Sequence, residues 1–260
     1  MHSILKEIVA SKTAAVEEKK KLLPADRLKE LCAVKKNVKR AGLYDALKSS
    51  GPNIIAEIKR ASPSKGLLTE SFDPLAIAKT YESGGAAAIS VLTEETFFLG
   101  SLEYLTAVKT GVSIPVLRKD FITEVYQLYE SYYAGADAVL LIAALLKADA
   151  LRELFRVASA LDMDCLFEIH DEEELKTVID CGARIVGINN RNLNDFKVDL
   201  SVSERLIPKV PKDKLIVIES GISGKGDINR FAALGAGNFL IGETLMRSAD
   251  PKSTLRELRT

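Results

Sequence analysis

The chain has 260 residues, 36 basic and 36 acidic side chains, and a hydrophobic share of 47%. This charge balance argues against binding to nucleic acid or to an anionic membrane, since either would need a basic surplus. The longest apolar run, AVLLIAALL from Ala138 to Leu146, is about half of what a membrane-spanning helix requires. The N-terminus has no long apolar core behind a basic start, so we expect no secretory signal and a cytoplasmic location.

The three cysteines and two histidines lack the spacing of a disulfide scaffold or a zinc site. We expect Cys32, Cys165 and Cys181 to be small buried thiols. No metal site is predicted.

Residues 1–50 are rich in Lys and Glu, with apolar pairs such as Ile4 and Ile8 at helical spacing. Pro24 interrupts the pattern, which predicts one or two extra helices ahead of the main domain. Two interpretations stay open for this extension: a solvated amphipathic cover over one end of the domain, or a segment that contacts substrate.

From Asn53 onward, short β-branched runs alternate with amphipathic stretches of helical length, as in a βα repeat. Asp73 and Pro74 predict the cap and first turn of one such helix. Glycines that can close a helix in the left-handed conformation precede several strands, at Gly85, Gly135, Gly182 and Gly235. The predicted strands are NIIAEIK, AAAISVL, IPVLRKD, DAVLLI, DCLFEI, RIVGIN, KLIVIES and NFLIG.

Eight evenly spaced strands favour a closed (β/α)8 TIM barrel over an open doubly wound sheet. We therefore expect a single domain over residues 1–260. It would consist of an N-terminal helical extension over 1–50 and the barrel over 53–260.

Polar side chains end five of the predicted strands. Alternate residues of a strand face the same side. The apolar residue two positions before each polar end, such as Leu117 before Lys119, therefore shares the inward face with it. The carboxyl ends of parallel barrel strands meet at one rim, and buried charges are costly unless paired or solvated. We therefore predict one polar pocket that gathers Glu57, Lys59, Lys119, Glu168, Asn189 and Glu219.

Glycine-containing loops follow the seventh and eighth predicted strands, as ESGIS and IGETL. In this fold these loops, with the start of a short helix, commonly bind phosphate through backbone N–H groups. Gly221 and Gly242 are the candidates, with Ser220 and the amide of Glu243 beside them.

The stretches IIAEIKRASPSKG, VLTEETFFLGS, VLRKDFI, GINNRNL, ESGIS and FLIGETLMR resemble the indole-3-glycerol phosphate synthase family. The likeness covers essentially the whole chain, including the N-terminal extension, and the first stretch is its most specific part. It implies conversion of 1-(2-carboxyphenylamino)-1-deoxyribulose 5-phosphate to indole-3-glycerol phosphate, carbon dioxide and water, with no cofactor. The implied partner is this small phosphosugar, and we expect a monomer that at most forms a weak homodimer.

The resemblance also implies roles for residues. Lys119 would be the general acid at the substrate ketone and Glu168 the base of the later dehydration. Lys59 would contact the substrate carboxylate or act as a second acid, and Glu57 would pair with a lysine. Residues implied to orient or bind the substrate are Asn189, Glu219, Ser62, Arg191, Phe98, Phe121 and Leu193, and those implied to hold its phosphate are Ser220, Gly221, Gly242 and Glu243.

Three expectations depend on charge. Neighbouring carboxylates raise a lysine pKa, so Lys119 needs Glu57 and Glu168 to lie nearer Lys59, or needs strong desolvation. Glu243 should bind phosphate through its N–H alone, with its side chain turned away. His170 should be a surface residue of the loop after Glu168.

Alternatives remain. Lys59 or Lys119 could form a Schiff base, as in class I aldolase-type barrels. Phosphoribosylanthranilate isomerase shares the fold and phosphate loops, but would not need the extension or the EIKRASPSKG strand. A non-catalytic phosphosugar-binding barrel would need the glycines, but not the lysines and Glu168.

Overall fold

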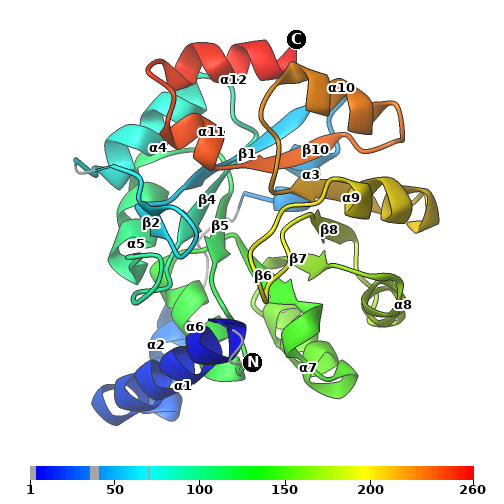
Figure 1. Cartoon of the computed structure of the whole chain (residues 1–260). Helices are drawn as coiled ribbons and strands as arrows, with labels where there is room; N and C mark the ends of the chain where they lie inside the picture. Colours follow the sequence, from blue (N-terminus) through cyan, green and yellow to red (C-terminus); the bar gives the residue numbers. More distant parts are fainter. Residues whose placement is uncertain (1–3, 36–40, 70) are drawn as a thin grey trace.

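A closed barrel of eight parallel strands forms the centre of the structure (Figure 1). The computed structural model describes residues 4–35, 41–69 and 71–260. The first strand pairs with both the last and the second of the barrel, which closes the sheet. The predicted barrel and its strands are thereby confirmed: β1 Asn53–Ile58, β4 Ala88–Leu92, β5 Val116–Lys119, β6 Ala138–Ile142, β7 Asp164–Ile169, β8 Ile185–Asn189, β9 Leu215–Glu219 and β10 Asn238–Ile241.

Helices surround the strands, and the alternation along each strand decides which side chains face them (Figure 1). Ile54, Ala56 and Ile58 pack outward against the helices, whereas Ile55 faces the barrel interior. The interior cluster also holds Leu117, Leu140, Leu166, Val217 and Leu240. The outer helices are α4 Pro74–Ser83, α5 Leu102–Gly111, α6 Val125–Ala134, α7 Ala148–Ala160, α8 Glu172–Asp180, α9 Ser201–Leu206, α10 Lys225–Ala232, α11 Glu243–Met246 and α12 Pro251–Arg259, with short turns η1 Ala143–Leu145 and η2 Ile207–Lys209.

Local sequence signals end and begin these helices as predicted. The Asp73 side chain accepts a hydrogen bond from the Ala76 N–H at the start of α4, where Pro74 occupies the first turn. The glycines expected to close helices all have positive φ, namely Gly85, Gly135, Gly182 and Gly235.

The N-terminal extension contains three described helices: α1 Ile4–Leu22, α2 Ala25–Val34 and α3 Leu43–Leu47. Pro24 separates the first two, as predicted, whereas α3 was not predicted. Helix α1 contacts the loops at the carboxyl ends of β4 and β5, while Tyr44 of α3 donates its N–H to Asp164 at the amino end of β7. Of the two interpretations left open for the extension, a cover over a single end does not describe it fully, because its described helices contact both ends of the barrel.

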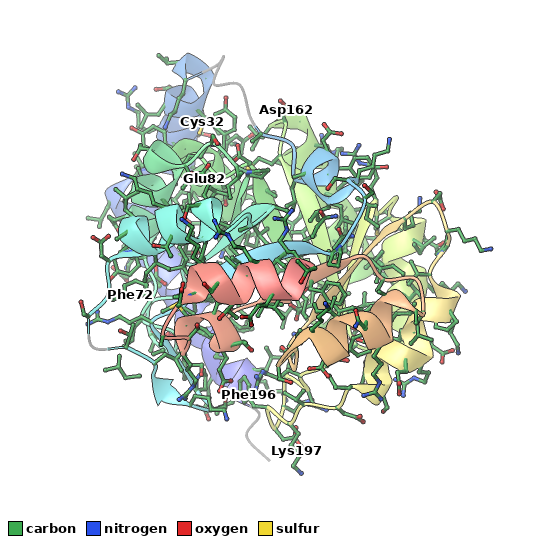
Figure 2. All side chains as sticks on the ribbon, turned by 90° about the horizontal axis from the view of Figure 1, so that it is seen from above. Cys32, Phe72, Glu82, Asp162, Phe196 and Lys197 are labelled. Carbon is green, nitrogen blue, oxygen red and sulfur yellow. The ribbon has the colours of Figure 1, made fainter. Side chains whose placement is uncertain are left out.

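The two ends of the barrel can be distinguished in Figure 2, where Asp162 lies at the amino end and Phe196 at the carboxyl end. Cys32 and Cys165 are buried, as expected, but Cys181 is partly exposed. No described helix is both long and apolar enough to cross a membrane. The stretch after Lys59 forms a small hairpin that was not predicted, from β2 Ala61–Ser62 and β3 Gly66–Leu67.

Candidate active site

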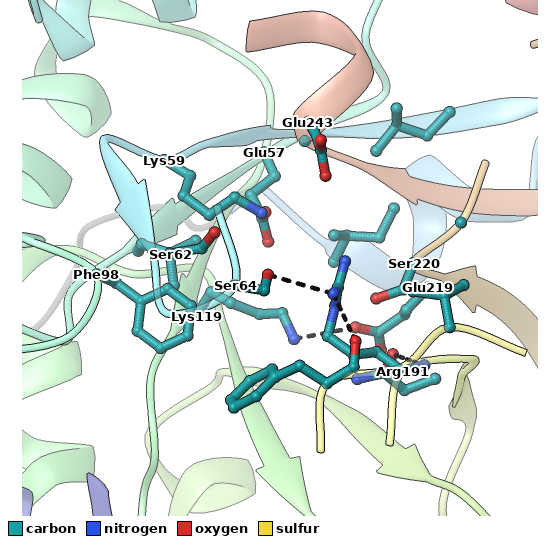
Figure 3. Close-up of a pocket in the computed structure, with 18 of the residues that line it drawn as sticks. Glu57, Lys59, Ser62, Ser64, Phe98, Lys119, Arg191, Glu219, Ser220 and Glu243 are labelled. Carbon is teal, nitrogen blue, oxygen red and sulfur yellow. Dashed lines mark hydrogen bonds and ion pairs between the residues drawn. The ribbon is translucent and has the colours of Figure 1, made fainter. Parts of the chain in front are cut away.

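A cavity of about 610 Å³ opens at the carboxyl ends of the strands (Figure 3). The structure brings every predicted site residue to its wall. From the strand ends these are Glu57, Lys59, Lys119, Glu168, Asn189 and Glu219, and from the loops Ser62, Phe98, Phe121, Arg191, Leu193, Ser220, Gly221, Gly242 and Glu243.

Lys59 and Glu57 form an ion pair on one side of this cavity. The Lys59 Nζ donates to Glu57 Oε1 at 2.6 Å, and the Glu57 side chain is buried. A Cβ at position 242 would collide with the Glu57 carboxylate in its present position, so the absence of a side chain at Gly242 leaves room for that carboxylate. Gly242 therefore makes room for Glu57 as well as bordering the predicted phosphate region.

Lys119 lies between two buried carboxylates. Its Nζ is 2.8 Å from Glu168 Oε2 and 3.0 Å from Glu219 Oε2, and both glutamates are 1% exposed. A Cβ at Gly187 of β8 would collide with Glu219 Oε1, so this strand glycine leaves space for the Glu219 side chain inside the barrel. The Lys119 ammonium thus forms ion pairs with two carboxylates, one from β7 and one from β9.

Glu168 has further partners on its other oxygen. The Asn189 Nδ2 donates to Glu168 Oε1 at 3.0 Å, and His170 Nε2 lies 3.6 Å from the same oxygen. The His170 Nδ1 lies 3.2 Å from Glu174 Oε2. The expectation of a surface histidine is wrong, because the ring is mostly buried between Glu168 and Glu174.

Apolar and polar walls meet at the loops. The rings of Phe98 and Phe121 lie 6.0 Å apart, centroid to centroid, and form one apolar wall with Leu193. Arg191 donates from Nη1 to the carbonyl oxygen of Phe196 at 3.0 Å. This bond holds the guanidinium across the loop after β8 (Figure 3).

The loop after β9 lies beside the start of α11, which follows β10. The Thr244 hydroxyl donates to the carbonyl oxygen of Ile222 at 2.7 Å, which joins them. Ser220 and Gly221 both have positive φ, 65° and 84°, and for a residue with a Cβ this conformation is uncommon. Such backbone outliers concentrate at functional sites.

Comparisons with known proteins identify the family of the chain. The family model described as indole-3-glycerol phosphate synthase matches residues 5–258. The chain belongs to the indole-3-glycerol phosphate synthase family. A relative with that name from Ruminiclostridium cellulolyticum is 50% identical over 98% of both chains, and one from Acetivibrio thermocellus is 44% identical over 98% of this chain and 99% of its own. The solved 3-hexulose-6-phosphate synthase from Salmonella typhimurium, 13% identical with a TM-score of 0.64, covers 80% of this chain and 96% of its own and shows the shared fold.

The arrangement of carboxylates around Lys119 is not the one that the sequence analysis required for a lowered lysine pKa. Burial alone lowers the pKa of Lys119, but attraction to Glu168 and Glu219 outweighs burial and raises it above its ordinary value. Glu57 pairs with Lys59, but Glu168 pairs with Lys119, so the condition that both glutamates lie nearer Lys59 is not met. In the free enzyme Lys119 is therefore a firmly held ammonium.

The two carboxylates beside Lys119 shift in opposite directions. Burial alone raises the pKa of Glu168, but Lys119 and His170 outweigh it and lower that pKa to about 2. For Glu219, burial and the repulsion of Glu168 prevail over the attraction of Lys119, which raises its pKa to about 7. A single ammonium cannot fully offset two buried negative charges, so one carboxyl tends to keep its proton.

Some wall residues escaped the sequence reasoning. Lys65 and Arg247 lie 3.5 and 3.3 Å from Glu243 Oε1, so the Glu243 carboxylate lines the cavity with two cations beside it. The expectation that this side chain turns away is wrong. The sequence did contain signals for these positions. Lys65 and Arg247 are the basic residues of SPSKG and LMR. His170 is two residues after Glu168, so the alternation of the strand, if continued, places it on the same inward face.

Proposed function

We propose that this cavity closes the indole ring of 1-(2-carboxyphenylamino)-1-deoxyribulose 5-phosphate, with loss of carbon dioxide and water. The chain is a carboxy-lyase of tryptophan biosynthesis, as its family membership indicates. The single observation that supports the mechanism is the placement of Lys119 between Glu168 and Glu219, in a cavity that also holds Lys59.

Lys119 is the proposed general acid. As the aromatic carbon attacks the ketone carbon, the carbonyl oxygen becomes a hydroxyl, and a positioned acid accelerates such a step by about 10²–10⁴-fold. Protonation of Glu219 removes one negative charge from the side of Lys119. The ammonium then gives up its proton more readily, so the pKa of Glu219 near neutrality bears directly on the acid.

Glu168 is the proposed base of the dehydration. Its lowered pKa keeps it ionised at neutral pH, and Asn189 holds its Oε1 by a hydrogen bond. Once Lys119 has delivered its proton, the cation that lowers the basicity of Glu168 is neutral. The two groups therefore act in the order of ring closure and then dehydration.

Lys59 is assigned to the substrate carboxylate. Its ammonium already rests on the carboxylate of Glu57, 2.6 Å away, and is 16% exposed toward the cavity. A second carboxylate from the substrate can share this ammonium. Lys59→Met should then raise KM more than it lowers kcat, whereas a role as second acid would lower kcat first.

The remaining residues bind the rest of the substrate. Phe98, Phe121 and Leu193 provide an apolar surface for the anthranilate ring, while Ser62, Arg191 and Glu219 face its polar groups. Ser220, Gly221, Gly242 and the N–H of Glu243 are the proposed phosphate ligands. Lys65 and Arg247 offset the charge of Glu243, which otherwise would repel the phosphate.

The test is turnover of the carboxyphenylamino-ribulose phosphate, followed by indole fluorescence. Product formation that is lost in Lys119→Ala and in Glu168→Gln supports the assignment. Folded wild-type protein that binds the substrate without product would favour the non-catalytic binding barrel. Borohydride trapping of the protein on the substrate would favour the Schiff-base mechanism, and absence of trapping with normal turnover supports acid–base catalysis.

We also propose that residues 1–260 act as one domain and as a monomer in the cytoplasm, without a cofactor. The proposed catalytic and binding residues line one cavity within this chain, so a monomer can hold a complete site. Light scattering at the assay concentration checks this, and a dimer that loses activity on dilution would contradict it.

A further inference from the structure

Helix α1 carries a buried lysine, Lys12, whose ammonium contacts the end of β5. Lys12 is 1% exposed, and its Nζ lies 2.5 Å from Glu95 Oε2 and 3.0 Å from Asp120 Oδ1. Glu95 is in the loop after β4, and Asp120 directly follows Lys119 at the end of β5. Lys12 therefore joins the N-terminal extension to two loops of the cavity.

These two loops adjoin Lys119, the last residue of β5, and carry two residues of the apolar wall. The loop after β4 contains Phe98, whose N–H donates to Glu94 at 3.0 Å, and the loop after β5 contains Phe121. The Asp120 Oδ1 accepts the N–H of Phe121 at 2.8 Å, and the N–H of Thr93 donates to the carbonyl oxygen of Lys119 at 3.1 Å. The backbone that follows Lys119 is thus held by Asp120, which Lys12 contacts, and by Thr93, whose hydroxyl donates to Asp120.

Stability alone does not explain a buried lysine at this place. Replacing a buried ion pair by apolar side chains is often neutral or stabilising, because the charges lose their hydration. Lys12 also contributes no atom to the cavity wall, which leaves a role through its neighbours.

We propose that Lys12 is a positioning residue for the reaction. Its ammonium holds the loops after β4 and β5 in register, so that Lys119 reaches the substrate ketone while Phe98 and Phe121 hold the aromatic ring. The N-terminal extension thereby contributes to catalysis without touching substrate. This inference rests on the proposed role of Lys119.

The test is Lys12→Met, which removes the charge and keeps the length of the side chain. Asp120 retains Arg118 at 2.8 Å and Thr93 at 2.6 Å, and Glu95 retains Lys19 at 2.7 Å, so the variant should fold. A misplacement of about 1 Å can cost about 10²-fold in rate. We expect kcat to fall by about 10- to 100-fold, with KM changed by less than about threefold.

The matched control is Lys20→Met on the same helix. Lys20 also joins α1 to the barrel, through Glu124 at 2.7 Å, but it contacts neither Glu95 nor Asp120 in the described contacts. This variant should keep kcat within about twofold at a temperature where circular dichroism shows both variants folded. Equal losses in the two variants would mean that α1 acts only by stabilising the fold, and would overturn the proposal.

Two further outcomes keep the result unambiguous. If Lys12→Met does not fold, Glu95→Gln replaces it, since Glu95 is 36% exposed and its loss loosens Lys12 from one loop. A fall in kcat of about threefold or more supports positioning, and unchanged kcat overturns it. If kcat is lost in Lys119→Ala but unchanged in Lys12→Met, this inference is overturned and the proposed function stands.

Discussion

Two groups of charged side chains lie on opposite faces of β5 and behave differently. The cavity cluster contains Lys119, Glu168 and Glu219, with one cation for two carboxylates. The flank cluster has three cations for three carboxylates, from Lys12, Lys19, Arg118, Glu95, Asp120 and Glu130.

The same kind of group is shifted in opposite directions in the two clusters. Burial alone raises the pKa of Asp120, but Arg118 and Lys12 outweigh it and hold that pKa far below its usual range. Glu219 is as deeply buried, yet its pKa rises to about 7. Balance of charge makes the flank cluster inert, whereas the single ammonium of the cavity cluster cannot offset both of its carboxylates and leaves one carboxyl poised to exchange a proton near neutral pH.

The largest expected effect comes from removing the cation of the cavity cluster. Lys119→Met should lower kcat by about 10²–10⁴-fold, because it removes the proposed general acid of the ring closure. Steady-state assay of indole formation measures the loss. A kcat near that of the wild type would mean that the unequal charge of the cavity has no catalytic use.

Removing the matching cation of the flank cluster should act on stability. Arg118 is fully buried and contacts Asp120, Glu130 and Thr93. Arg118→Met leaves buried carboxylates unpaired and should lower the free energy of unfolding by about 3–5 kcal/mol. Urea denaturation checks the value. If Arg118→Met lowered the free energy of unfolding by less than Lys119→Met does, the division into a structural flank cluster and a reactive cavity cluster would be contradicted.

The raised pKa of Glu219 predicts an effect of pH on stability. The folded state binds the proton more tightly than the unfolded state, so stability falls as pH rises from about 4.5 to about 7. Glu219→Gln removes this penalty, and its stability relative to the wild type should improve by roughly 2 kcal/mol between pH 5 and pH 8. Chemical denaturation at both pH values measures the change, which should be absent if Glu219 titrates normally.

The smallest effect concerns His170 beside Glu168. Burial alone lowers the pKa of His170, but Glu174 and Glu168 outweigh it, so the folded-state pKa lies above the ordinary value. The stabilisation is complete below the unfolded pKa and is lost as pH rises through the folded one. His170→Asn should therefore destabilise the protein more at pH 5.5 than at pH 9, and equal destabilisation at the two pH values would contradict the charged contact.

Much of the site could be predicted from the sequence because it depends on strand periodicity. Glu57 and Lys59, or Leu117 and Lys119, must share a face in any strand, and in a closed parallel barrel that face leads to one rim. The contacts of α1 could not be predicted in this way. Lys12 is 83 residues from Glu95 and 108 from Asp120, and the spacing of its own helix does not reveal which loops it meets.

The sequence by itself determined the barrel, the ends of its helices and the polar residues at the strand ends, because these follow from local conformation and period. Only the tertiary structure decided which carboxylate lies beside which ammonium, that His170 is enclosed between two glutamates, and that the extension reaches both barrel ends. Ion pairing and burial depend on distances across the chain of a few ångströms, and pKa values follow from those distances rather than from residue type.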